Sequence, residues 1–192
     1  MSSRYRSGGG PAVAPANRQA LLRAAREAFS EIGFGASLNE IAKRAGVGHG
    51  TMYRHFPDRI ELAVAVFDSD IAAFEQFDSR RNGTLDDLLD VVAKAATSAA
   101  ALTELLMTHR SDPRVARLDD RIRRTVTRIY ERARAAGQLG PHLTAEHVML
   151  AAAMLALALG KCGHRTQSAL VADEARALFG AAFTARLPLE PS

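Results

Sequence analysis

Apolar positions along the chain recur at the spacing of buried helix faces. Leu22, Ala25, Phe29 and Ile32 stand three or four residues apart, which places their side chains on one stripe of a helix. Two glycines follow, so the first helix is predicted over about residues 18–32. No alternation typical of strands is present, and the fold class is predicted to be all-α. Further helices are predicted over about 38–45, 49–55, 60–77, 84–109, 113–136 (one helix or two), 144–161 and 171–186.

Two of these helices are short and are joined by the turn AGVG. Ser37 and Glu40 have the spacing of a capping box, in which each side chain satisfies a backbone N–H at the start of the helix. Pro57 ends the second short helix, because the residue before a proline is disfavoured in helical conformation. Two short helices on a tight turn, preceded by a bracing helix, are typical of a helix-turn-helix. An ordinary helical hairpin fits the same pattern.

The distribution of charge favours the first alternative. Residues 1–66 hold nine basic and five acidic side chains, whereas the 16 basic and 16 acidic residues of the remainder cancel. The formal net charge of +4 therefore lies in the first third, which indicates an anionic partner. Gly48 and Gly50 leave backbone N–H groups accessible at a helix start, which suits a phosphate. The hydrogen-bond donors that follow predict contact with DNA; a solvated polar face is the alternative.

Composition excludes several other classes of protein. The 192 residues have ample apolar content for a core, and the one cysteine excludes an internal disulfide and fits a reducing cytosol. The N-terminus lacks the apolar region of a signal peptide, and the longest apolar run is shorter than a membrane span. A cytoplasmic protein is expected. The sequence shows no catalytic constellation and no cofactor-binding motif. The spacing of Cys162 and His164 alone does not indicate a metal site.

The segment SLNEIAKRAGVGHGTMYRHFPDRIEL, residues 37–62, resembles the DNA-binding signature of the TetR family of transcriptional regulators. The similarity extends upstream through AAREAFSEIGF and covers about residues 17–67. A weaker similarity, over 132–148, is to the region before the dimer-forming helices. The expected organisation is a disordered tail (1–16), a DNA-binding domain (17–67, with the helix-turn-helix at about 36–55) and a C-terminal ligand-binding and dimerisation domain (68–187).

The resemblance implies a ligand-responsive repressor that binds a palindromic operator as a dimer. A transcriptional activator of the same fold, or a helical small-molecule-binding protein without DNA function, is the alternative. Gly48 stands where the family usually has a serine cap, and glycine is only slightly weaker there. The positions implied to contact phosphates are Ser37, Thr51, Tyr53, His55 and Arg59. Those implied to meet base edges are His49 and Gly50, with Arg54 and Arg44 as helpers.

Two features concern the C-terminal half. The run from Val148 to Leu159 is apolar all round its helix, as in a chain core or a subunit interface. With the resemblance, it predicts a homodimer through the last two helices, the final one buried at Val171, Leu178, Phe179, Ala182 and Phe183. The arginines of 121–137 could form a second nucleic-acid site. The acidic residues of the same segment favour a solvated, salt-paired helix face, with pairs Asp119–Arg123 and Asp120–Arg124.

Large side chains in the same half could surround an effector. Each of them is also compatible with plain core packing. A pocket among them would suit an apolar or aromatic molecule, with His109 or Tyr130 as the polar anchor. The candidate pocket residues are Phe67, Phe74, Phe77, Met107, His109, Tyr130 and Met149.

Overall fold

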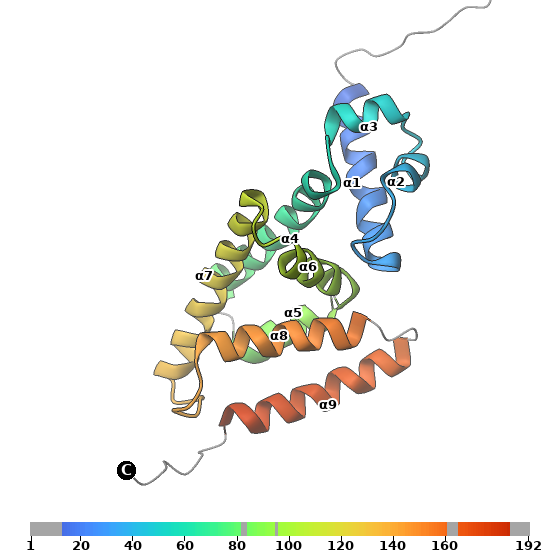
Figure 1. Ribbon diagram of the computed structural model, residues 1–192. Helices are drawn as coiled ribbons and strands as arrows, with labels where there is room; N and C mark the ends of the chain where they lie inside the picture. Colours follow the sequence, from blue (N-terminus) through green and yellow to red (C-terminus); the bar gives the residue numbers. More distant parts are fainter. Residues whose placement is uncertain (1–12, 82–83, 95, 161–164, 185–192) are drawn as a thin grey trace, which may run out of the picture.

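The structure is a computed structural model that describes residues 13–81, 84–94, 96–160 and 165–184. Within these ranges the chain forms helices and no strand, which confirms the all-α class (Figure 1). The helix-turn-helix lies at one end of the molecule, and α8 and α9 lie at the other. The helices are α1 (Val13–Ile32), α2 (Leu38–Arg44), α3 (His49–His55), α4 (Arg59–Arg81), α5 (Leu85–Lys94), α6 (Ala96–Thr108), α7 (Pro113–Ala135), α8 (Ala145–Gly160) and α9 (Arg165–Thr184).

A Schellman motif makes the turn between α2 and α3. Gly46 has φ of 66°, a left-handed conformation that glycine adopts without steric cost. The N–H of Val47 donates to the carbonyl of Ala42 at 3.0 Å, and the N–H of Gly46 donates to that of Lys43 at 3.2 Å. These bonds satisfy the last carbonyls of α2 and turn the chain sharply into α3.

The first hydrophobic core joins the helix-turn-helix to the rest of the chain. Phe29 of α1 lies near its centre, with ring centroids 6.1 Å from Phe34 and 5.9 Å from Phe67. Ile41, Met52 and Phe56 enter from α2, α3 and the following loop, while side chains of α6 and α7 close the other side. Because α4 also contributes to this core, the helix crosses the predicted domain boundary at residue 67 without a break.

A second core lies farther from α3. It is formed by α5, the second half of α7, α8 and α9. The buried Tyr130 hydroxyl donates to the carbonyl of Leu143 at 2.8 Å, so the loop after α7 is fastened to that helix. The N–H of Gly140 donates to the carbonyl of Phe183 at 2.7 Å and fastens the end of α9 to the same loop. These two hydrogen bonds connect α7 and α9 through the same loop.

Carboxylates of α4 and arginines of α7 hold these two helices side by side. The pairs follow one another in the same order along both helices, so α4 and α7 run in the same direction. We refer to the four arginines as the arginine ladder: Arg114 bound to Asp58 and Glu61, Arg121 bound to Asp68 and Glu75, and Arg128 and Arg132 bound to Asp78.

The predicted single helix over 84–109 is wrong. The structure has two helices, whose directions between Leu85–Ala93 and Ser98–Thr108 differ by 98°. Leu88 and Leu89 of α5 pack in the second core, whereas Ala101 and Leu105 of α6 pack in the first. A straight helix could not bury both faces in their separate cores.

Other boundaries shift at the helix ends. The first helix begins at Val13 rather than near Arg18, so residues 13–16 of the predicted tail are helical; Pro15 is compatible with a first turn. Residues 1–12 lie outside the described part. The final helix begins at Arg165, six residues before the predicted start. Residues 113–136, predicted as one helix or two, form one helix to Ala135.

Burial also departs from the prediction at particular positions. Ile32, predicted inward, is 51% exposed, and Leu178, predicted buried in the last helix, is 66% exposed. Ala182 is exposed as well, whereas Phe183 is buried. Among the described residues, no single helix is long and apolar enough to cross a membrane; the bent pair α5 and α6 meets the criterion only by combined length and composition.

Candidate nucleic-acid interface

Helix α3 is held by a small part of its surface. Met52 is its one buried residue, at 1% exposure, and it packs with Ile41 and Ala42 of α2. The other faces carry His49, Gly50, Tyr53 and Arg54, all exposed. Tyr53 is 47% exposed although it is aromatic. A helix that keeps most of its side chains in solvent while one residue anchors it can be presented to a partner.

The start of α2 has half of the predicted capping box. Ser37 caps the helix, and its hydroxyl oxygen accepts from the N–H of Asn39 at 3.3 Å. Glu40, expected to reach back to Ser37, accepts instead from Arg44 at 2.7 Å. The cap position was therefore predicted correctly, but an ion pair with Arg44 takes the place of the reciprocal bond.

The arginines of this region are engaged in different ways. Arg44 donates to Glu31 of α1 at 2.6 Å as well as to Glu40, and these bonds raise the pKa of its guanidinium. Arg54 folds back on α3, donating to the carbonyl of Gly50 at 3.1 Å and to Thr51 at 2.9 Å. Arg44 would have to give up two ion pairs to reach DNA, whereas Arg54 would give up only exposed bonds within its own helix.

The remaining predicted phosphate contacts lie beside α3. Thr51 and His55 are half-buried on the helix, and the His55 ring centroid lies 6.4 Å from that of Phe56. Arg59, the first residue of α4, has its guanidinium 5.8 Å from the centroid of the Phe34 ring. Stacking of this kind orders an arginine without neutralising its charge. The three residues are therefore positioned by the fold and keep polar groups near the surface.

The glycines at the start of α3 have room around them. Gly48 caps the helix with φ of −67° and ψ of 149°, without a side-chain hydrogen bond. A Cβ atom at Gly48 or at Gly50 would meet no atom of the chain within 4 Å. Neither position is required to be glycine by internal packing or by a left-handed backbone, so the missing side chains leave open surface next to His49.

A charged cluster fixes the junction between α3 and α4. Asp58 caps α4, accepting from the N–H of Glu61 at 2.7 Å. The Arg114 guanidinium donates to Asp58 at 3.0 and 3.2 Å, to Glu61 at 3.0 Å and to Asp112 at 2.8 Å. Hydrogen bonds from the Arg114 side chain and backbone lower the pKa of Asp112 to about 2. The start of α7 is thus bound directly to the residues that follow α3.

The described residues of the predicted effector pocket are distributed over the two hydrophobic cores and the surface. Phe67 is buried in the first core against Phe29, whereas Phe74 and Met149 pack on the second. His109 contacts Phe34 edge-on at 5.1 Å. Tyr130 donates within the second core, Met107 is 62% exposed, and the Phe77 side chain lies outside the described residues.

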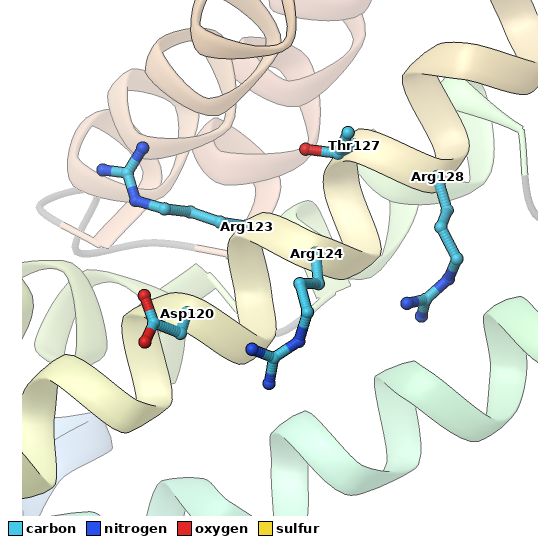
Figure 2. A pocket seen from close by; sticks show the side chains of 5 residues that line it. All are labelled: Asp120, Arg123, Arg124, Thr127 and Arg128. Atoms are coloured by element: carbon cyan, nitrogen blue, oxygen red, sulfur yellow. The ribbon is translucent and has the colours of Figure 1, made fainter.

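The exposed side of α7 has a shallow depression of about 390 Å³ (Figure 2). Arg124 and Arg128 project to one side of the helix and Arg123 to another. The predicted pair Asp119–Arg123 is present at 2.7 Å. The predicted pair Asp120–Arg124 is absent from the described side chains, and three arginines of this segment, Arg121, Arg128 and Arg132, bind α4. Because Arg123 and Arg128 already have carboxylate partners, the depression has little unbalanced charge.

Comparisons with known proteins converge on one family. The sequence model described as "Bacterial regulatory proteins, tetR family" matches residues 21–66, the segment that holds the helix-turn-helix. The HTH-type transcriptional regulator SAB2452 of Staphylococcus aureus is 42% identical over 59 residues, 30% of this chain and 32% of that protein. The chain thus spans about a third of the length of the curated relatives it matches.

Solved structures extend the likeness to most of the chain. The TetR transcriptional regulator SCO0520 from Streptomyces coelicolor is 26% identical, with a TM-score of 0.54 over 86% of this chain and 97% of that one. Residues 21–66 are a DNA-binding domain of the TetR type, and most of the chain shares the fold of TetR-family regulators. FadR from Bacillus subtilis, solved in complex with stearoyl-CoA, shares the TetR fold with a TM-score of 0.61 at 16% identity, over 86% of this chain and 98% of that one.

Two features of the chain are not predicted by the sequence patterns described above. The arginines of 121–137 are predicted to form a salt-paired face within their own helix, whereas the ladder binds α7 to carboxylates of α4 and Asp58. Arginines 114, 121 and 128 and acidic residues 61, 68 and 75 each recur every seven residues. That matched period was the signal for two paired helices. Lys43 is not among the predicted contacts, because only the fold shows which neighbouring charges have partners. Cys162 and His164 lie outside the described residues.

Proposed function

We propose that the chain is a sequence-specific DNA-binding transcriptional regulator. The observation that carries this proposal is the surface of α3, which buries Met52 and turns its polar side chains to solvent within a TetR-family domain. In a helix-turn-helix the second helix enters the major groove. Ser37, Thr51, Tyr53, His55 and Arg59 then hold phosphates.

The base-reading part of the proposal concerns the first turn of α3. His49 and Gly50 face solvent, and Arg54 can exchange its bonds within α3 for bonds to a base. The engaged position of Arg44 argues against direct reading by that residue. Phosphate contacts set register and affinity, whereas base contacts set sequence preference. The two groups are therefore expected to respond differently to substitution.

We further propose a homodimer through α8 and α9. Four of the large apolar side chains that are exposed in the described residues lie on these helices: Leu150, Met154, Leu170 and Leu178. Leu150 and Met154 are four residues apart and share one face of α8. An exposed apolar surface of this kind on one end of a chain marks a site of association. A two-fold dimer would present two α3 helices to a palindromic operator.

The dimer proposal is tested by measuring mass in solution. Met154→Glu and Leu178→Glu should convert a dimer at micromolar concentration to a monomer, since each puts a charge into the interface. Met107→Glu is the matched control, because Met107 is equally exposed but lies on α6. A wild-type monomer, or a dimer that persists in both α8 and α9 variants, would remove this part of the proposal.

The C-terminal helices are proposed to bind an apolar or aromatic effector that releases the operator, so the chain acts as a cytoplasmic, ligand-responsive repressor. FadR, bound to stearoyl-CoA, supports an apolar ligand for a chain of this fold. Helix α4 joins the two parts and is fastened to α7 by the arginine ladder. A coupling of about 1–3 kcal/mol would weaken operator binding about 5- to 150-fold. An activator of the same fold would use the same contacts.

Selection of genomic DNA fragments by the full-length chain tests the central proposal. A defined palindrome should be enriched, and its affinity should fall steeply with salt because phosphate contacts release counterions. Tyr53→Ala should weaken binding to every selected sequence, whereas His49→Ala should change the preference at particular base pairs. If no duplex is bound above the level of a neutral control protein at low salt, a small-molecule-binding protein without DNA function becomes the better description.

A further inference from the structure

A depression of about 570 Å³ lies between α2 and the first turn of α3. Its lining residues are Asn39, Glu40, Lys43, Val47 and His49. Asn39 and Lys43 are four residues apart on α2, so they share one face of that helix. The depression therefore places two polar side chains of α2 beside His49, the first residue of the helix proposed to enter the groove. Figure 1 shows α2 and α3 together at the end of the molecule.

The charges around this depression are distributed unequally. Glu40 is neutralised by Arg44, which is also bound to Glu31 and held toward α1. Lys43 is exposed and has no hydrogen bond or ion pair from its ammonium to any described residue. The other cations of residues 37–59 are Arg44, Arg54 and Arg59, and each contacts a carboxylate, a carbonyl or an aromatic ring. Among these four cations, Lys43 is therefore the one whose charged group has no contact with another described residue.

We infer that Lys43 reads a base edge of the operator, adjacent to the position contacted by His49. The inference rests on the proposed function and extends the reading surface from α3 to α2. A lysine ammonium in the major groove is suited to guanine, whose O6 and N7 are both acceptors. Asn39, on the same wall of the depression, can bond to the N6 and N7 of an adenine. The preferred operator half-site is accordingly expected to contain a guanine beside the bases read by α3.

A lysine at this place could instead contact only a phosphate. The two roles differ in a measurable way, because loss of a phosphate contact weakens binding equally on all sequences and lowers the salt slope by about one. Loss of a base contact removes the preference at one position. The position of Lys43 beside His49, in a depression bounded by both helices, favours the base contact.

The test is selection from a randomised duplex library with full-length wild-type protein, Lys43→Ala and Asn39→Ala. Arg44→Gln is the matched control, because it removes the neighbouring cation on α2 that is already paired. Lys43→Ala should lose preference for guanine at one position of each half-site by about 5- to 150-fold and leave the other positions unchanged. Arg44→Gln should retain the preference. Thermal unfolding checks that each variant is folded, as expected for an exposed substitution.

Three outcomes separate the possibilities. A selected motif that is identical for wild type and Lys43→Ala, with unchanged affinity, overturns the inference and leaves the proposed function intact. A uniform loss of affinity with an unchanged motif and a smaller salt slope assigns Lys43 to a phosphate and also overturns it. If the wild-type protein enriches no sequence, the proposed function fails first, and the inference fails with it.

Discussion

Arg114 binds the first turn of α7 to the start of α4, and its replacement by glutamine should destabilise the protein measurably. The side chain is 26% exposed and pairs with Asp58, Glu61 and Asp112, which are 49%, 43% and 20% exposed. Partly exposed ion pairs contribute about 0.2–1 kcal/mol each, so three of them contribute about 2 kcal/mol in total. A cation in the first turn of a helix opposes the helix dipole, so these carboxylates explain why an arginine is tolerated there.

Thermal unfolding at a fixed chain concentration measures the effect. A loss of about 2 kcal/mol lowers the Tm of a chain of this size by about 4–8 °C. Arg123→Gln is the control, because its pair with Asp119 lies within α7 and should contribute only about 0.3–0.5 kcal/mol. Fixed concentration is needed because the Tm of a dimer depends on concentration.

A double-mutant cycle isolates the contact between the two helices. Asp58→Asn removes the charge but keeps a good N-cap for α4, since asparagine caps as well as aspartate. The Arg114→Gln and Asp58→Asn effects should be non-additive, with a coupling of about 0.5–1 kcal/mol. A Tm change below 1 °C in Arg114→Gln, or additive effects in the cycle, would refute the view that this cluster fastens α7 to the DNA-binding end.

Three further predictions concern other parts of the chain. Gly50→Ala should raise the free energy of unfolding by up to about 1 kcal/mol, because its Cβ has open space, but should weaken operator binding in a titration at fixed salt; a gain in both would show that DNA does not approach Gly50 closely. Asp78→Asn should lower the free energy of unfolding, measured by denaturant titration, by about 2 kcal/mol. The Asp78 side chain is only 1% exposed, and the substitution removes its charge opposite Arg128 and Arg132. An unchanged denaturation midpoint would contradict this. The pKa of Asp112 is lowered from 3.8 to about 2, so its ionised form stabilises the fold above pH 3.8, and this contribution is lost as the pH falls toward 2. The Tm of Asp112→Asn should therefore decline less over that window than the Tm of wild type. Equal declines would count against the prediction.

The sequence alone predicted almost all of the helix-turn-helix. Its caps, glycine turn and proline stop are local features, and local hydrogen bonding and backbone sterics act within a few residues. The predicted helix starts at about residues 84 and 113 have the same local basis, because Thr84 and Asp112 cap these helices. The Thr84 hydroxyl and Asp87 form a reciprocal cap, and Asp112 accepts from the N–H of Arg114 at 2.9 Å.

Long-range packing decided the remainder. The bend between α5 and α6 exists because the two helices bury their faces in different cores, which no local pattern records. The difference between Arg44 and Lys43 has the same origin: adjacent in sequence, they project from α2 in different directions, and only one meets a carboxylate of α1. The exposure of Leu178 likewise depends on where α9 lies. Periodicity and capping fix where helices form, but the partner of each side chain depends on residues distant in sequence, and only the folded chain brings those together.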